Sequence, residues 1–364
     1  MVFILNGNFI SKFTRYRSGI PLYNIPMANT PIVSICIPCF NEERTIRKVL
    51  EALGRQTYPL SQMEVVIADG MSEDATRARI REFQEANPKL EVRVLDNPKR
   101  IIPAALNIAV EAARGKYIVR LDGHSIPHPE YVARSIAGLD QRLGDNIGGI
   151  WKIVPPEDNW IAHSIAAAAA HPLGVGDAKY RYADTPGEAD TVPFGAFRKD
   201  YFTELGGFDE SLHTNEDYEF NTRIRQAGGR LWLDPGIQVQ YYSRSNLAAL
   251  ARQYARYGYW KARMVRRYPG SLRWRQALPP LFVLSLVVLL LASIWLPAAL
   301  WLLLAEVVLY VGALIVSGLD VVLDKHNIPL LFGVPIAIAV MHLSWGGAFI
   351  WSLITSAFQK AETI

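Results

Sequence analysis

The sequence predicts an α/β protein with a mostly parallel, doubly wound sheet, followed by a helical membrane region. Strand-like apolar runs alternate with segments of helical periodicity between Pro31 and Asp122. This alternation is typical of βαβ units, whose strands run parallel. Residues 277–364 contain only six charged side chains, although 20% of the whole chain is charged. The composition therefore excludes a disordered chain, a collagen and a disulfide scaffold, and indicates a water-soluble part followed by a membrane part.

The first half of the chain gives the clearest strand and helix pattern. Strands are expected over residues 31–38, 64–69, 91–95 and 116–121. A helix is expected after Asn41, because four apolar residues recur at helical spacing: Ile46, Val49, Leu50 and Leu53. Ser72 is expected to cap a second helix that turns Ile80 and Phe83 inward, and a third helix should cover 104–114.

Three acidic residues fall at the ends of predicted strands: Asp69, Asp96 and Asp122. Ligands of doubly wound sheets bind beyond the carboxyl ends of the strands, so this edge is the expected site. The first strand is not followed by G-x-G-x-x-G, and no G-x-x-x-x-G-K-[ST] occurs. Dinucleotide-binding and P-loop classes are therefore disfavoured.

The pattern is less regular after Gly149. A strand is possible over 191–198, a turn at Gly206-Gly207, and a helix over 216–226. Residues 231–242 predict one or two short strands around Pro235.

A basic, aromatic-rich helix is expected over 246–268. It carries Arg252, Arg256 and Lys261, and no acidic residue lies between Asn246 and Gln276. Because the helix precedes an apolar run, we expect it to lie on the membrane surface, where basic residues attract anionic lipid. A plain solvated face is the alternative, and no nucleic-acid-binding motif supports a nucleic-acid partner.

Three membrane spans are expected in the C-terminal part. Residues 278–318 have one charge, Glu306, and Pro297 divides them into two spans of minimal length. Residues 328–355 supply a third segment after a polar loop at 320–327, and this segment could instead be re-entrant or interfacial. Glu306 and His342 are expected to pair between spans or to lie near a lipid ligand. Truncation after Gln276 should give a more soluble protein that keeps the expected site at the strand ends.

Neither the cysteine pair nor the N-terminal segment is expected to take part in the chemistry of the site. Cys36 and Cys39 form a lone C-x-x-C in a strand, without a second ligand pair, and are expected to be core residues. Residues 1–30 lack the pattern of a signal peptide and could be a membrane-surface arm or a disordered leader.

Several short motifs converge on one family. They are Ile37-Pro38-Cys39-Phe40-Asn41-Glu42-Glu43, Ala68-Asp69-Gly70-Met71-Ser72, Asp122-Gly123-His124, Gly206-Gly207-Phe208-Asp209-Glu210 and Asn215-Glu216-Asp217. In this order the chain resembles the family 2 inverting glycosyltransferases of the GT-A fold. The basic helix and apolar C-terminus resemble the membrane-bound exopolysaccharide branch, including succinoglycan-type glucosyltransferases.

The resemblance implies roles for individual residues. Asp217 would be the catalytic base, and Asp122 and His124 would hold a divalent metal, Mn²⁺ or Mg²⁺. The nucleotide sugar would contact Pro38, Asn41, Glu42, Asp69, Asp122, Gln253 and Arg256. Asp122-Gly123-His124 replaces the usual Asp-x-Asp, and Tyr257 replaces the usual Trp of Gln-x-x-Arg-Trp.

The resemblance also implies a function. A UDP-sugar would donate its sugar, with inversion, to a polyprenyl-diphosphate-linked saccharide during bacterial cell-surface polysaccharide assembly. The enzyme would be multi-pass in the inner membrane, with its catalytic domain in the cytoplasm. The expected parts are a leader (1–30), the GT-A domain (31–245), an interfacial helix with its linker (246–276) and the transmembrane region (277–364). A polyprenyl-phosphate sugar synthase and a catalytically silent membrane scaffold are the alternatives.

Overall fold

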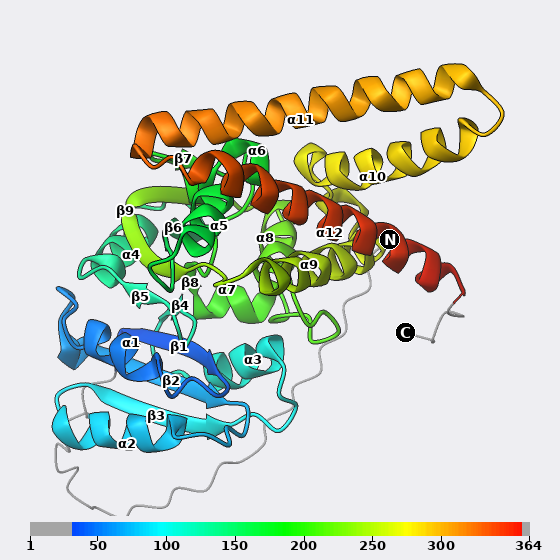
Figure 1. Ribbon diagram of the computed structural model, residues 1–364. Helices are drawn as coiled ribbons and strands as arrows, with labels where there is room; N and C mark the ends of the chain where they lie inside the picture. Colours follow the sequence, from blue (N-terminus) through cyan, green and yellow to red (C-terminus); the bar gives the residue numbers. More distant parts are fainter. Residues whose placement is uncertain (1–30, 359–364) are drawn as a thin grey trace, which may run out of the picture.

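The computed structural model describes residues 31–358, and the expectations for residues 1–30 lie outside this range. The described chain forms one sheet in the order β3-β2-β1-β4-β8-β6-β9-β5, with β7 paired to β9 (Figure 1). Its first four strands are parallel, as expected: β1 (Val33–Cys39), β2 (Met63–Asp69), β3 (Glu91–Asp96) and β4 (Tyr117–Arg120). The helices between them are α1 (Ile46–Leu53), α2 (Thr76–Ala86) and α3 (Ile102–Ala112).

From β8 onward the sheet is mixed. The remaining strands are β5 (Ile126–Pro127), β6 (Asn146–Val154), β7 (Gly187–Glu188), β8 (Ala196–Arg198) and β9 (Leu231–Tyr242). β8 runs antiparallel to both β4 and β6, whereas β6 and β9 are parallel. Residues 231–242 therefore form one strand rather than two. Its register shifts beside Gly149, where a Cβ atom would lie 1.8 Å from the Ile237 carbonyl oxygen, so this close approach requires glycine.

The sheet separates two apolar cores. Alternate β1 residues face opposite sides, so Ile35 and Ile37 join one core and Cys36 joins the other. Cys36 and Cys39 are both buried free thiols, which confirms their expected core role. Burial raises the pKa of both thiols, which keeps them protonated and unreactive.

One predicted helix cap is wrong. α2 begins after Ala75 without any side-chain cap, although Ile80 and Phe83 are buried as expected. The Ser72 hydroxyl donates to Asp69 instead, and it accepts from the Asn41 N–H at 2.8 Å. Ser72 therefore joins the loops after β1 and β2 rather than starting a helix.

The second half adds helices around the mixed strands. They are α4 (Tyr131–Asp140), α5 (Trp160–Ala170), α6 (Pro172–Val175), α7 (Lys199–Glu204), α8 (Glu216–Gln226) and α9 (Leu247–Arg267). Short 3-10 turns occur at Leu60–Gln62, Lys179–Arg181 and Pro269–Ser271. The bounds of α8 match the expected helix, and Asn246 caps α9 by accepting from the Ala249 N–H at 2.9 Å.

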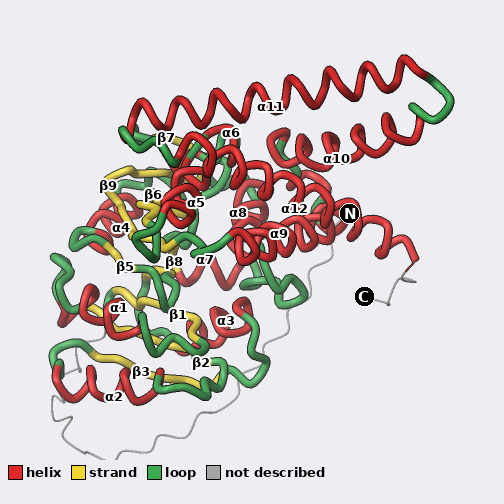
Figure 2. Tube along the Cα trace, viewed as in Figure 1, coloured by secondary structure: helices red, strands yellow, loops and turns green. Residues whose placement is uncertain are grey.

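Three C-terminal helices are long and apolar enough to cross a membrane. They are α10 (Trp274–Ala292), α11 (Pro297–Lys325) and α12 (Leu330–Phe358). α10 and α11 form a hairpin at the end of the molecule opposite β3 and α2 (Figures 1 and 2). Pro297 begins α11 as the sequence predicts, but the polar segment 320–325 stays helical. Glu306 accepts from Ser285 of α10, and His342 contacts the Tyr310 hydroxyl of α11, so both pair between helices.

α9 packs along α12 and shares a core with it. Leu250 and Tyr254 of α9 lie in one buried cluster with Val334, Ile338 and Met341 of α12. Lys261 is only 1% exposed and donates to the Ser271 carbonyl at 2.9 Å. The expectation that Lys261 meets lipid is therefore wrong, because its side chain points into the protein. Because α9 and α12 share this core, truncation after Gln276 would expose apolar residues of α9, which argues against the expected gain in solubility.

Candidate functional site

A buried arginine at the end of β4 gathers three carboxylates. The Arg120 side chain is 2% exposed and forms ion pairs with Asp122 at 3.0 Å, Glu216 at 2.8 Å and Asp217 at 2.9 Å. β4 supplies the arginine, the loop after it supplies Asp122, and the first turn of α8 supplies the two other acids. The fold thus joins motifs that are almost 100 residues apart in sequence.

Asp217 is held by two donors on one oxygen. Its Oδ2 accepts from Arg120 Nη1 and from the Phe194 N–H at 3.0 Å. Burial raises the pKa of Asp217 to about 7; Arg120 and the Phe194 N–H oppose this shift, and the Glu216 carboxylate adds to it. A carboxylate with a pKa near 7 can both take up and release a proton at neutral pH, as a general base must.

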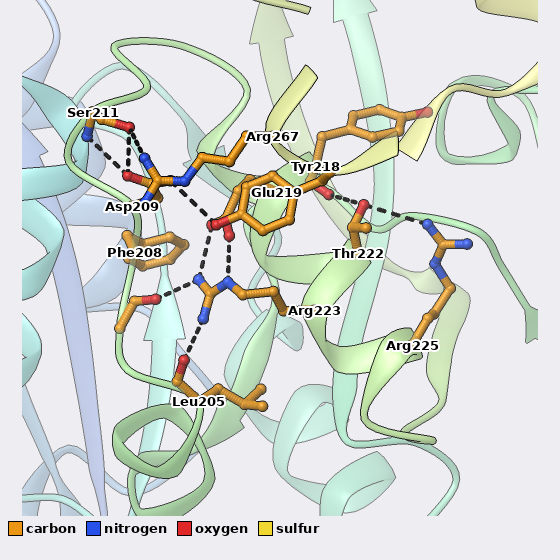
Figure 3. A network of polar contacts seen from close by, with 12 residues as sticks. Leu205, Phe208, Asp209, Ser211, Tyr218, Glu219, Thr222, Arg223, Arg225 and Arg267 are labelled. Atoms are coloured by element: carbon orange, nitrogen blue, oxygen red, sulfur yellow. Dashed lines mark hydrogen bonds and ion pairs between the residues drawn. The ribbon is translucent and has the colours of Figure 1, made fainter. Parts of the chain in front are cut away.

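A second polar network holds α8 in place. Arg223 pairs with Glu219 one turn earlier and donates to the carbonyl oxygens of Leu205 and Gly207 in the preceding loop (Figure 3). Gly206 and Gly207 have φ values of +84° and +74°, a left-handed conformation that glycine adopts without strain. The loop is fixed to the helix that begins with Glu216-Asp217, which limits the positions open to the base.

Arg267 extends this network to α9. Its Nε lies 3.1 Å from Asp209 Oδ2, and the Tyr268 hydroxyl donates to the same oxygen at 3.2 Å (Figure 3). The Gly206–Asp209 motif is therefore structural in this fold. It connects the helix carrying Asp217 with the helix that packs on α12.

Other residues predicted to bind the nucleotide form a neighbouring cluster. Asp69 is fully buried and accepts from Ser72 and from Arg77 Nε at 2.6 Å. Asn41 joins this cluster through Ser72 and through the Glu73 N–H, which donates to Asn41 Oδ1 at 2.9 Å. Pro38 lies in β1 opposite Ala68. The structure brings Pro38, Asn41 and Asp69 together at the ends of β1 and β2, but Asp69 does not line the cavity described below.

Glu42 connects this cluster to the predicted metal ligands. Its Oε1 lies 2.8 Å from His124 Nδ1. Burial lowers the pKa of His124, but the hydrogen bond to Glu42 and the Asp122 charge outweigh it and raise the pKa above its usual value. A carboxylate on one ring nitrogen orients the other nitrogen toward a metal, as in many metal sites.

The fit of a divalent metal can be judged from the donor set. Asp122 Oδ1 is buried. It forms an ion pair with Arg120 at 3.0 Å, but it accepts no hydrogen bond. Residues 31–358 contain no group of three or more His, Cys, Asp or Glu side chains arranged to hold a metal. Asp122 and His124 therefore fit a metal that takes its other ligands from phosphate oxygens and water, as Mg²⁺ and Mn²⁺ commonly do.

A cavity of about 1200 Å³ extends from these residues to the membrane helices. Arg120, Asp122, His124 and Asp217 line one end, and residues of α10, α11 and α12 line the other. The membrane-helix wall includes Leu281, Phe282, Val288, Glu306, Tyr310 and His342. One cavity thus extends from the candidate base to apolar side chains of the membrane helices.

The two residues of the Gln253-x-x-Arg256 motif occupy different positions. Arg256 lines the cavity, whereas Gln253 donates to the hydroxyls of Tyr241 at 3.2 Å and Tyr257 at 2.8 Å. Gln253 therefore positions two aromatic side chains of the cavity wall and does not itself line it.

Sequence reasoning missed Arg120, Trp151 and Tyr241. Arg120 had a visible signal, because a charged residue ends the apolar strand Tyr117–Arg120, two residues before Asp122. Trp151 stacks on Tyr241 at 4.2 Å, but these residues come from different strands and their pairing has no local sequence pattern.

Comparisons with known proteins agree with this fold. The model of glycosyl transferase family 2 matches residues 34–206, and that of glycosyl transferase family 21 matches residues 193–359. The chain is 32% identical to the succinoglycan biosynthesis protein ExoA of Rhizobium meliloti (strain 1021), over 86% of this chain and 93% of ExoA. It is 27% identical to a dolichyl N-acetyl-α-D-glucosaminyl phosphate 3-β-D-2,3-diacetamido-2,3-dideoxy-β-D-glucuronosyltransferase of Methanococcus voltae, over 86% of this chain and 95% of that protein.

A solved structure supports the fold alone. The mannosyltransferase PcManGT from Pyrobaculum calidifontis, in complex with GDP-Man and Mn²⁺, matches with a TM-score of 0.58 at 19% identity, over 89% of this chain and 87% of that chain. The fold is GT-A, followed by three helices able to span a membrane. With the identity to ExoA over nearly its whole length, these findings make the chain a glycosyltransferase that belongs to glycosyl transferase family 2.

Proposed function

We propose that the chain is an inverting glycosyltransferase that moves a sugar from a UDP-sugar to a polyprenyl-diphosphate-linked saccharide during bacterial cell-surface polysaccharide assembly. The observation that carries this proposal is the cavity that joins Asp217 to α10, α11 and α12. A soluble acceptor needs no apolar extension of the active site, whereas a lipid-linked acceptor must bring a hydroxyl to the base while its chain stays in the bilayer.

The chain's own residues account for the chemistry. Asp217 Oδ1 takes the proton from the acceptor hydroxyl as its oxygen attacks the anomeric carbon. The bond between that carbon and the UDP oxygen breaks, and UDP leaves from the opposite face. Arg120 holds Asp217 Oδ2 throughout, so the base keeps its orientation. An α-linked donor then gives a β-linked product.

The departing diphosphate needs positive charge. Asp122 and His124 would hold a divalent metal, Mn²⁺ or Mg²⁺, which when bound stabilises the charge on the diphosphate. Pro38, Asn41, Glu42 and Asp69 would form the nucleotide side of the site. Arg256 lines the cavity and supplies a further cation, while Gln253 acts through Tyr241 and Tyr257.

The proposed membrane orientation follows from charge. Basic residues cluster just before α10 and within its first turn: Arg263, Arg266, Arg267, Arg273 and Arg275. Basic flanks of membrane helices stay on the cytoplasmic side. We therefore place the catalytic domain in the cytoplasm and the three helices across the inner membrane.

The test is a donor screen with the purified full-length protein and a bacterial lipid extract. Each nucleotide sugar is supplied with Mn²⁺, and lipid products are identified by mass spectrometry. A saccharide on lipid diphosphate that gains one sugar residue, with UDP released, would support the proposal. A single sugar on lipid monophosphate would instead identify a polyprenyl-phosphate sugar synthase.

A further inference from the structure

Arg181 is a cation of the cavity wall, and no described residue is its acidic partner. Its guanidinium lies 5.0 Å from the Trp151 ring and 5.2 Å from the Tyr180 ring, and Nη1 donates to the Ala169 carbonyl at 3.0 Å. Within residues 31–358 no Asp or Glu oxygen lies within ion-pair distance of it. Two rings and a carbonyl thus hold the guanidinium in place without neutralising it.

Two other cations of the cavity wall differ in this respect. Arg120 has three carboxylate partners, and Arg275 pairs with Asp177 and with Asp190, the latter at 2.7 Å. A charge withdrawn from water is costly unless an opposite charge compensates it. The neutral surroundings of Arg181 therefore favour an anion that arrives with a ligand.

The position of Arg181 indicates which ligand. Phe194 lies under Arg120 at 4.6 Å, and its ring centroid is 5.5 Å from that of Trp151, above which Arg181 lies. Two aromatic rings thus separate Arg181 from the arginine that holds the base. Arg181 also donates to the carbonyl of Ala169 in the last turn of α5, a helix that packs on α12.

We propose that Arg181 binds the diphosphate that joins lipid and saccharide in the acceptor. This rests on the proposed function and assigns a phosphate subsite on the membrane side of the base. The saccharide would lie over the interval between Arg181 and Asp217, with the isoprenoid chain along α10 and α12. Arginine suits this task because its planar fork can bond two phosphate oxygens at once.

The first experiment measures binding without turnover. Full-length protein in detergent is saturated with UDP and Mn²⁺, so that the donor site is filled, and is then titrated with farnesyl diphosphate or farnesol. Wild type should bind farnesyl diphosphate at least tenfold more tightly than farnesol, and Arg181→Gln should lose most of that difference. Arg181→Lys should retain part of it. Arg79→Gln, an exposed change on α2, is the matched control and should behave as wild type.

The second experiment separates acceptor from donor. In transfer assays, Arg181→Gln should raise the KM for the lipid-linked acceptor about tenfold or more, with little change in kcat or in the Kd for UDP. Equal weakening of UDP binding would assign Arg181 to the donor diphosphate and overturn the proposal. If Arg181→Gln does not fold, the titration of the wild-type protein tests the proposal by itself. Equal affinity for farnesyl diphosphate and farnesol would overturn the proposed subsite.

The outcomes also separate this inference from the proposed function. Preferential binding of farnesyl diphosphate that depends on Arg181 supports the subsite even if no saccharide acceptor is found. Transfer to a lipid-linked saccharide with an unchanged acceptor KM in Arg181→Gln keeps the function and removes the subsite.

Discussion

Replacing Asp217 with asparagine isolates the proton transfer from the rest of the site. The asparagine oxygen can accept the same two hydrogen bonds, from Arg120 Nη1 and the Phe194 N–H, so the loop and α8 should stay in place. Arg120 keeps two carboxyl partners, Asp122 and Glu216. The side chain loses only its charge and its ability to accept a proton. A general base contributes roughly 10²–10⁴-fold to a rate, so kcat should fall by about that factor.

Glu216→Gln is the matched comparison. Glu216 is buried and, like Asp217, pairs with Arg120, and its charge raises the pKa of Asp217. Removing that charge should lower the pKa of Asp217 and leave most of the activity at pH 8. UDP release is followed in a coupled assay with the lipid acceptor, and UDP binding is measured by calorimetry for both variants. A kcat within tenfold of wild type for Asp217→Asn, together with a hundredfold loss for Glu216→Gln, would assign the base to Glu216 and refute our reasoning.

Four further predictions follow from the same residues. Transfer should rise with pH through about 7, because the base must be ionised and burial raises the pKa of Asp217 to about 7; a rate independent of pH between 6 and 8 would contradict this. In the unfolded chain the Asp217 carboxyl has a pKa of about 3.9, so the free energy of unfolding should fall as pH rises from about 4 to 7. Thermal melts of Asp217→Asn, which has no such proton, should lack that part of the decline. Chelation of divalent ions should abolish transfer, and His124→Ala should weaken the Mn²⁺ dependence; full activity after exhaustive chelation would show that side chains alone neutralise the diphosphate. Truncation after Gln276 removes Val334, Ile338 and Met341 from the core shared with α9, so the product should aggregate or melt at lower temperature, and a monodisperse product with the wild-type melting temperature would contradict the shared core.

The first half of the fold could be predicted because its signals are local. β1, β2 and β4 are mainly apolar runs, and β3 alternates charged and apolar residues. Ile46, Val49, Leu50 and Leu53 repeat at helical spacing and are all buried. The strands from β5 onward could not be placed in the same way. Their partners lie far away in sequence, as when β8 inserts between β4 and β6, and such pairing leaves no local periodicity.

The candidate site shows the same division. Asp122 and Asp217 stand in short motifs and could be selected from the sequence. Arg120 stands out as a charged residue in an apolar strand, but no local pattern shows that it pairs with both acids. The environment of Lys261 was unpredictable for a related reason. A basic helix before an apolar run has the composition of a membrane-surface helix. Lys261 is buried instead, 4.4 Å from the Tyr218 ring of α8 and bonded to the Ser271 carbonyl. Only tertiary packing decides which face of such a helix meets lipid.

The central claim is that the acceptor reaches Asp217 through the cavity between the catalytic domain and the membrane helices. Photo-crosslinking measures this most directly. A farnesyl diphosphate carrying a diazirine on its isoprenoid chain is irradiated with the full-length protein and UDP, and labelled peptides are mapped by mass spectrometry. Our account predicts labels on cavity residues such as Leu281, Phe282 and Met341, and their loss when unlabelled farnesyl diphosphate is added in excess. Labels confined to exposed residues of α11, such as Val308 and Leu309, and unaffected by that competitor, would contradict it.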